Sequence, residues 1–359
     1  MINCFKQPKR EQPGGIWVFL AFIACLFMSC TGENEIIEPL SKDETYQLEK
    51  PSGFPEMTFD ITGNPVTVNG VALGKKLFYE GKLSRNNTIS CGFCHIQEYA
   101  FTHHGHTVSH GIDDRLGIRN APPIQNMAFL KNYTWDGVSH NLDERSLVPI
   151  TTDFEMDSSL PEAVAKLNAD ANYKKMFMAA FGDENITGEK ILKAISQFMV
   201  TMISADSKYD RMKKGNAVFN AEESQGMALF QNKCASCHSG DLFTDESYRN
   251  TGMYYNPQLD DRGRYRVTLD WNDNMKFRVP SLRNVEYTAP YMHDGRFYSL
   301  EAVMNFYSEN VENQPNLDPL LKQNGHIGIP MTSLEKQNII TFLKTLSDKN
   351  FIMNTKFAE

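Results

Sequence analysis

The sequence predicts a mainly α-helical fold with long loops and few strands. Apolar residues recur at helical spacing behind capping residues, and strand-like alternation is scarce. A C-x-x-C-H motif also occurs twice, 143 residues apart, and each copy follows a predicted helix. Since a chain of 359 residues suggests about two domains, the repeat predicts two helical domains of one plan, covering residues 54–205 and 206–359.

The first 30 residues are typical of an export signal. A basic start precedes a 13-residue apolar run, residues 16–28, which is shorter than the ~20 residues of a membrane-spanning helix. Ser29 and then Cys30 follow, as in a bacterial lipoprotein signal, so Cys30 is predicted to carry a lipid. This places the folded part on the periplasmic side of a Gram-negative cell envelope, held at the membrane. The alternative is an uncleaved N-terminal anchor. Residues 31–53 are polar, acidic and unpatterned, which predicts a tether.

The charge balance limits the class of partner. The chain has 36 basic and 44 acidic residues, a net charge of −8. A nucleic-acid-binding protein needs a basic surface, so this class is excluded. The balance permits docking with a basic protein but does not require it.

Four cysteines lie beyond residue 30, and they form two pairs of identical spacing. The two copies of the motif are Cys91-Gly92-Phe93-Cys94-His95 and Cys234-Ala235-Ser236-Cys237-His238. This is the attachment motif of haem c, in which two thiols bond to the porphyrin and the histidine ligates the iron. A zinc site built from both pairs would leave both histidines unexplained, and a thioredoxin-like redox pair requires a strand before the motif. We therefore expect two covalently bound haems c, one in each domain.

The predicted helices follow from periodicity and capping. They cover residues 71–80 before the first motif, segments of 161–181, residues 187–202, residues 220–233 before the second motif, and a final helix from residue 332. Asn220 with Glu223 and Thr332 with Glu335 have capping-box spacing, and Gly182 marks a helix end. The link between the domains is predicted at residues 205–207.

The sixth ligand of each iron decides between an open site and an electron carrier. Four histidines follow the first motif closely: His103, His104, His106 and His110. Any one of them alone is more often part of a solvated loop. After the second motif the candidates are Met253, Met275, Met292, Met304 and Tyr307. Methionine is more often core filler than a ligand. Tyr307 shares a predicted helical face with Leu300, Val303 and Met304, which suits either a ligand or a core tyrosine.

Further motifs extend the pattern beyond the haem attachment sites. They are residues 101–102, 119–122, 135–137, 155–156, 280–284 and 288–295. With them, residues 74–346 resemble the bacterial di-haem cytochrome c peroxidase and methylamine-utilisation (MauG-like) family. The resemblance implies a cytochrome-c-peroxidase type oxidoreductase. Its N-terminal haem would take hydrogen peroxide, and its C-terminal haem would receive electrons from a small donor such as cytochrome c or a cupredoxin. A homodimer stays open.

The resemblance also implies roles for individual residues. Glu155 matches the distal acid–base glutamate, and Trp135 matches the tryptophan between the haems. Asn120, with the carbonyls of Thr288 and Pro290, matches an interdomain calcium site, and all-oxygen ligation suits calcium. His110 stands near the position of a removable distal histidine on the first haem.

Three residues depart from the family pattern. Tyr307 stands where peroxidases place methionine and the MauG-like branch places tyrosine, with Met304 one turn earlier as the alternative ligand. Asn232 replaces a tryptophan that the MauG-like enzyme uses. Arg145 stands where the family usually has glutamine, and the sequence gives no reason for it. The predicted function is therefore a di-haem peroxidase. The alternatives are a MauG-like oxidase of a protein or small molecule, and a non-enzymatic electron carrier or sensor.

Overall fold

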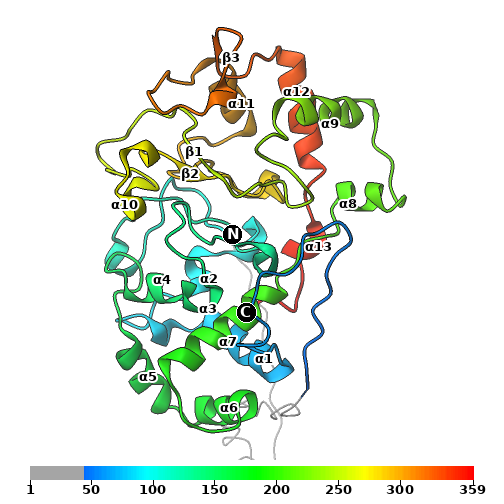
Figure 1. Cartoon of the computed structure of the whole chain (residues 1–359). Helices are drawn as coiled ribbons and strands as arrows, with labels where there is room; N and C mark the ends of the chain where they lie inside the picture. Colours follow the sequence, from blue (N-terminus) through cyan, green and yellow to red (C-terminus); the bar gives the residue numbers. More distant parts are fainter. Residues whose placement is uncertain (1–43) are drawn as a thin grey trace, which may run out of the picture. The chain divides into compact units, whose positions relative to one another are not determined.

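The computed structural model describes residues 44–359, which are mainly helical (Figure 1). The predicted signal with Cys30, and residues 31–43 of the predicted tether, lie outside the described residues. Residues 44–53 of that tether include contacts with the folded part. Thr45 is bridged to Thr67, and the Tyr46 amide donates to the Val66 carbonyl at 3.0 Å. Within residues 44–359, no helix combines the length and hydropathy needed to cross a bilayer.

The helices and strands follow one another in a simple order. The α-helices are α1 Val68–Phe78, α2 Cys91–Cys94, α3 Leu142–Arg145, α4 Leu147–Thr151, α5 Leu160–Asn168, α6 Ala171–Phe181, α7 Gly188–Thr201, α8 Lys208–Lys213, α9 Ala221–Lys233, α10 Tyr265–Thr268, α11 Leu300–Glu309, α12 Ser333–Lys344 and α13 Lys349–Ile352. The strands are β1 Tyr248–Arg249, β2 Phe277–Arg278, β3 Lys322–Gln323 and β4 His326–Ile327. Each sheet is a two-stranded antiparallel pair, β1 with β2 and β3 with β4. The prediction of a mainly helical fold with few strands is confirmed.

The helix boundaries follow the predicted caps closely. Asn220 and Thr332 each form a complete capping box, and the Thr187 hydroxyl accepts from the Lys190 amide. Gly182 ends α6 in the left-handed region, at φ 82°. The helix before the first motif begins at Val68 rather than Val71, because the Thr67 hydroxyl caps it by accepting from the Gly70 amide.

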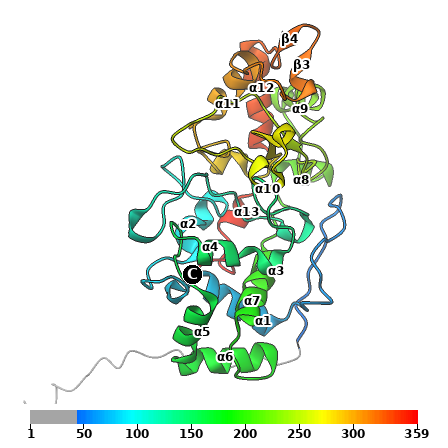
Figure 2. The same cartoon turned by 60° about the vertical axis from the view of Figure 1, so that its left-hand side comes forward.

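Each half of the described chain contains a close crossing of two long helices. Helix α1 packs on α7, and α9 packs on α12; both pairs lie side by side in Figures 1 and 2. A Cβ at Gly74 of α1 would lie 1.9 Å from the Ala194 carbonyl oxygen, and one at Gly226 of α9 would lie 2.0 Å from the Asn338 carbonyl oxygen. Each crossing therefore requires glycine, and each of these two glycines lies on the helix that comes before a C-x-x-C-H motif, α1 or α9.

The buried apolar side chains form two clusters. The first is built mainly from residues 54–202, and the second from residues 209–346. Helix α13 and the residues after it return to the first cluster, where Phe351 and Phe357 are buried. The Tyr79 hydroxyl donates to the Phe357 carbonyl at 2.7 Å. The end of the predicted second domain thus completes the first core.

A fully buried ion pair holds the segment between the two clusters. Arg283 is 0% exposed and donates two hydrogen bonds to the Asp210 carboxylate, at 2.9 and 2.8 Å. It also donates to the carbonyls of Asp241 and Ser204. Because removing one partner of a buried pair leaves an uncompensated charge, this contact fixes how α8 joins the loop that carries Arg283.

Gly226→Ala tests the second crossing. The added methyl group would overlap the Asn338 carbonyl, so we expect the free energy of unfolding to fall by about 1–3 kcal/mol. Urea unfolding followed by circular dichroism measures it. The control is Gln225→Ala on the exposed side of α9, with an expected change of about 0.5 kcal/mol or less. Equal unfolding curves for the two variants would contradict the close crossing.

Candidate functional site

The first motif forms a single helical turn that presents His95. Helix α2 spans the two cysteines, and His95 follows as its C-terminal cap. The His95 Nδ1 atom lies 2.7 Å from the Phe101 carbonyl oxygen. A carbonyl can only accept, so Nδ1 carries the proton and Nε2 keeps a free lone pair. Burial lowers the pKa of His95 to about 4, so the imidazole stays neutral and able to ligate a metal.

The second motif repeats this arrangement at the end of α9. His238 Nδ1 lies 3.1 Å from the Phe243 carbonyl oxygen, and burial lowers the pKa of His238 as well. Both carbonyls belong to phenylalanines in the left-handed region, Phe101 at φ 60° and Phe243 at φ 53°. In both histidines, a hydrogen bond from Nδ1 to a phenylalanine carbonyl therefore leaves Nε2 free to ligate a metal.

Aromatic packing fixes the two carbonyls. The Phe101 ring lies 5.6 Å from that of Phe351, in the first core. The Phe243 ring lies 5.0 Å from that of Tyr209 and 6.2 Å from that of Phe342, in the second core. A hydrogen bond to the non-ligating nitrogen orients a histidine ligand. Core packing thus sets the direction of each imidazole.

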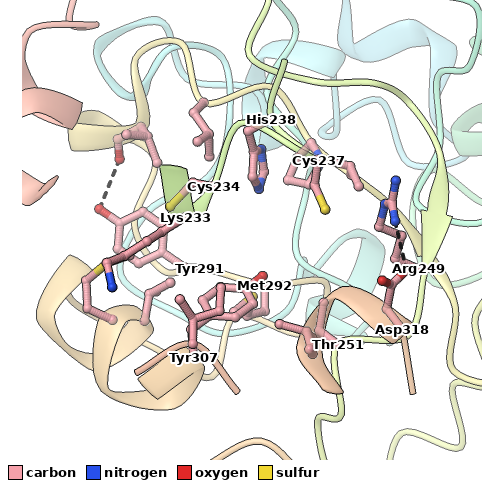
Figure 3. A pocket seen from close by; sticks show the side chains of 18 of the residues that line it. Lys233, Cys234, Cys237, His238, Arg249, Thr251, Tyr291, Met292, Tyr307 and Asp318 are labelled. Atoms are coloured by element: carbon pink, nitrogen blue, oxygen red, sulfur yellow. Dashed lines mark hydrogen bonds and ion pairs between the residues drawn. The ribbon is translucent and has the colours of Figure 1, made fainter. Parts of the chain in front are cut away.

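A cavity of about 400 Å³ adjoins the second motif and is lined mainly by apolar side chains. Figure 3 shows His238 on one side of this cavity and Tyr307 and Met292 on the opposite side. Burial raises the pKa of the Tyr307 hydroxyl, and the sulfurs of Cys237 and Cys234 add to the shift. The volume lies within the usual range of cofactor sites, roughly 300–1,000 Å³.

Helix α11 supplies one wall of the cavity. Leu300, Val303, Met304 and Tyr307 all line it, which confirms the predicted shared face. Met253 and Met292 line it too, whereas Met275 is buried elsewhere. The choice between Tyr307 and Met304 as the iron ligand stays a prediction.

Two arginines stand at the same cavity. Arg249 on β1 pairs with Asp318 at 2.9 Å and with Asp245 at 2.7 Å. Arg278 on β2 is buried and, among the described residues, forms no ion pair; it donates to the Thr134 carbonyl at 3.2 Å. A buried cation without a carboxylate suits a ligand that brings its own, as the propionates of haem do.

The four motif cysteines fit haem attachment better than the alternatives. They form no disulfide. Within residues 44–359, no group of three or more His, Cys, Asp or Glu side chains is arranged to hold a metal ion, so the two pairs do not form a zinc site. Neither motif follows a strand, as a thioredoxin-like pair would. Paired thiols, an oriented neutral imidazole and an apolar cavity together suit haem c.

Glu155 lies beside the first motif. Its backbone is held by the Thr152 carbonyl at 3.0 Å and the Ile112 amide at 2.8 Å. Burial raises the pKa of the Glu155 carboxyl, and Arg145 opposes that rise. The carboxylate also acts electrostatically on both cysteines of the motif, Cys91 and Cys94. The structure therefore brings the predicted acid–base residue to the first motif.

Three of the four predicted histidines stand in a row. The His110 carbonyl accepts from the Cys94 thiol at 3.5 Å, and the His110 ring lies 4.6 Å from His106. His106 in turn stacks on His103 at 4.4 Å. His104 instead stacks on Tyr99. His110 is thus close to the first motif, and its ligation of iron stays a prediction.

Asn120 joins this row to the second cavity. Its side-chain Nδ2 lies 3.1 Å from His103 Nε2. Its backbone N–H donates to the His293 carbonyl at 2.7 Å, and its backbone carbonyl accepts from Trp135 Nε1 at 2.9 Å. Trp135 is buried, and it lines the second cavity together with Asn120, Thr288 and Pro290. The predicted calcium residues therefore line the same cavity, and calcium itself stays a prediction.

Sequence reasoning missed the carbonyls of Phe101 and Phe243 and the unpaired Arg278. The available signal was an apolar aromatic residue five or six positions after each motif histidine. Arg145 departs from the family pattern, but nothing in the sequence shows its surroundings.

The comparisons with known proteins agree with this site. A family model described as di-haem cytochrome c peroxidase matches residues 68–218. Methylamine utilization protein MauG of Methylorubrum extorquens is 32% identical over 89% of each chain, and cytochrome c551 peroxidase of Pseudomonas aeruginosa is 29% identical over 86% of each. A crystal structure of a MauG-like protein associated with microbial copper homeostasis is 34% identical, with a TM-score of 0.79 over 88% of this chain and 99% of that one. The chain belongs to the di-haem cytochrome c peroxidase and MauG family.

Proposed function

We propose that this protein reduces hydrogen peroxide to water with electrons from a small periplasmic donor protein, such as a cytochrome c or a cupredoxin. The observation that carries the proposal is the partly buried carboxyl of Glu155 beside the first motif, whose pKa is raised by desolvation. A carboxyl whose pKa lies above that of an ordinary glutamate holds a proton more readily, which suits a group that takes and returns one. The reaction consumes two electrons and two protons for each peroxide and yields two waters.

The residues of the first motif would hold one haem, through Cys91, Cys94 and the His95 Nε2 atom. When bound, the iron porphyrin supplies the electron chemistry on peroxide. Glu155, as the carboxylate, accepts the proton of one peroxide oxygen and donates it to the other, so that water can leave. Its position in a desolvated site keeps that proton from bulk water.

The residues of the second motif would hold the other haem and receive electrons from the donor. Trp135 lines the cavity of the second motif, and its indole donates to the Asn120 backbone carbonyl. We assign it the transfer of electrons between the halves. Calcium bound by Asn120, Thr288 and Pro290 would hold the two halves of the chain together near Trp135. The lipid at Cys30 would keep the protein at the periplasmic side of the membrane.

A MauG-like oxidation of a protein or small molecule is the second candidate. Tyr307 supports it, because a tyrosinate stabilises ferric iron and lowers the potential of the haem it ligates. Asn232 opposes it, since it lines the second cavity where the MauG-like enzyme is expected to have tryptophan. Assays with reduced cytochrome c against other donors distinguish the two.

Glu155→Gln should abolish the proton transfer while leaving both haems in place. We expect turnover of peroxide to fall by about 10²- to 10⁴-fold, with unchanged haem spectra. Stopped-flow oxidation of a reduced donor measures it. Glu184→Gln, on an exposed loop, serves as the control and should keep full activity. Full activity in Glu155→Gln would remove the role assigned to this carboxyl.

The pH profile provides an independent test. Glu155 must start as the carboxylate, so turnover should rise with pH as the group ionises and fall below its pKa. Because burial raises that pKa above the 4.5 of an ordinary glutamate, the fall should begin at a higher pH than 4.5. Initial rates across a pH series check this. A rate that stays constant down to pH 4.5 would contradict the assignment.

Tyr307→Phe tests the ligand of the second iron. Loss of the phenolic oxygen should convert a six-coordinate second haem to a five-coordinate, high-spin one, detected by electron paramagnetic resonance. Met304→Leu, one turn away on α11, should leave the spectrum unchanged. The reverse pattern would assign Met304 instead. Two low-spin haems in every redox state of the unmodified protein, with no peroxide reaction, would favour an electron carrier or sensor.

A further inference from the structure

Among residues 44–359, Arg145 is a cation without a counter-ion. It ends α3, and within this part of the chain its one hydrogen bond is a long one, from Nε to the Tyr133 carbonyl at 3.4 Å. Its Nη1 atom is buried and has no partner among the same residues. An arginine keeps its charge at any physiological pH, so burial does not neutralise it. A buried charged donor left unpaired is destabilising unless a ligand completes it.

The nearby carboxylates do not fill this role. Asp136 acts on Arg145 electrostatically, but its oxygens are taken by Arg119 at 2.6 Å and by Thr134 at 2.9 Å. Glu155 is the strongest of the attractive partners. Among residues 44–359, however, Arg145 forms no ion pair, with Glu155 or with any other carboxylate.

Arg145 lies near the first motif. It acts electrostatically on His95, on Cys91 and on Glu155. His95 and Cys91 belong to the motif itself, and Glu155 follows α4. The cation and the acid–base carboxyl therefore both influence the motif that would hold the first haem, and among the described residues they form no ion pair with each other.

We propose that Arg145 is a catalytic residue that, together with Glu155, forms an anion-binding site for peroxide at the first haem. The guanidinium donates charge-assisted hydrogen bonds to the peroxide oxygen that gives its proton to Glu155, and so stabilises the negative charge left on it. This rests on the proposed function, because it assumes that peroxide enters at the first motif. A glutamine at this position would donate a hydrogen bond but no charge, which explains what the arginine adds.

The chemistry of the site extends to other small anions. Fluoride, a hydrogen-bond acceptor that binds ferric haem, is the probe. In the holoprotein, both fully oxidised and with the second haem reduced, fluoride is titrated against the absorption spectrum of the first haem. The fluoride Kd should rise by about tenfold or more in Arg145→Gln and by less in Arg145→Lys, as expected for loss of a charge-assisted hydrogen bond.

The control is Arg85→Gln. Arg85 is an exposed arginine in the same half of the chain, paired with Asp157 at 3.0 Å, and its substitution should leave the Kd unchanged. Haem content is measured for every variant. Arg145→Lys gives the answer if Arg145→Gln does not fold: a Kd equal to that of the unmodified protein then overturns the proposal.

Two results would overturn it. One is an unchanged fluoride Kd in a fully loaded Arg145→Gln protein. The other is loss of the first haem with unchanged fluoride affinity in the remaining loaded protein, which would assign Arg145 to a haem propionate. Failure of the unmodified protein to bind fluoride at either haem in either redox state is a different outcome, because it removes the open site and with it the proposed function.

Discussion

Two hydrogen bonds, each between an imidazole Nδ1 and the carbonyl of a buried phenylalanine, govern the geometry of this protein. They fix the tautomer of His95 and His238, so that each Nε2 atom keeps a lone pair that can ligate a metal. The carbonyls can be offered only because Phe101 and Phe243 take left-handed backbone angles while their rings stay in the two cores. In each half of the chain, the packing of one phenylalanine in the core thus also sets the orientation of the histidine that would ligate the metal.

The local features of the fold could be predicted from the sequence, and the long-range ones could not. The capping boxes at Asn220 and Thr332 depend on residues three positions apart, so a short segment of sequence is enough to predict them. The partner of each motif imidazole is a backbone carbonyl, and every residue has one, so the sequence does not show which carbonyl it is. The surroundings of Arg145 depend on Glu155 and Asp136, whose approach is decided by loops. The row of His103, His106 and His110 was visible as a cluster, but its order and the departure of His104 were not.

The arginines in the interior of the protein are of two kinds. Arg283 and Arg119 are matched by carboxylates within 3 Å and hold segments of the fold together. Arg278 is buried, Arg145 is partly buried with its Nη1 atom out of contact with water, and neither has such a partner among the described residues. A fold that satisfies its structural arginines and leaves these two unmatched is organised to receive anionic groups. Asn120 hydrogen-bonds to both halves of the chain, to His103 in the first and to His293 in the second.

The return of the chain to its first core has a consequence for how the protein is made. Gln97 donates to the Phe351 carbonyl, 254 positions later in the sequence, and the Phe101 ring packs on Phe351 and Phe357. The first core therefore cannot be completed until nearly the whole chain has been synthesised. Contacts of such high sequence separation slow folding. During that interval the thiols of Cys91 and Cys94 lie in an incomplete core that a haem-attachment apparatus can still reach, so the two attachment reactions need not follow the order of the motifs.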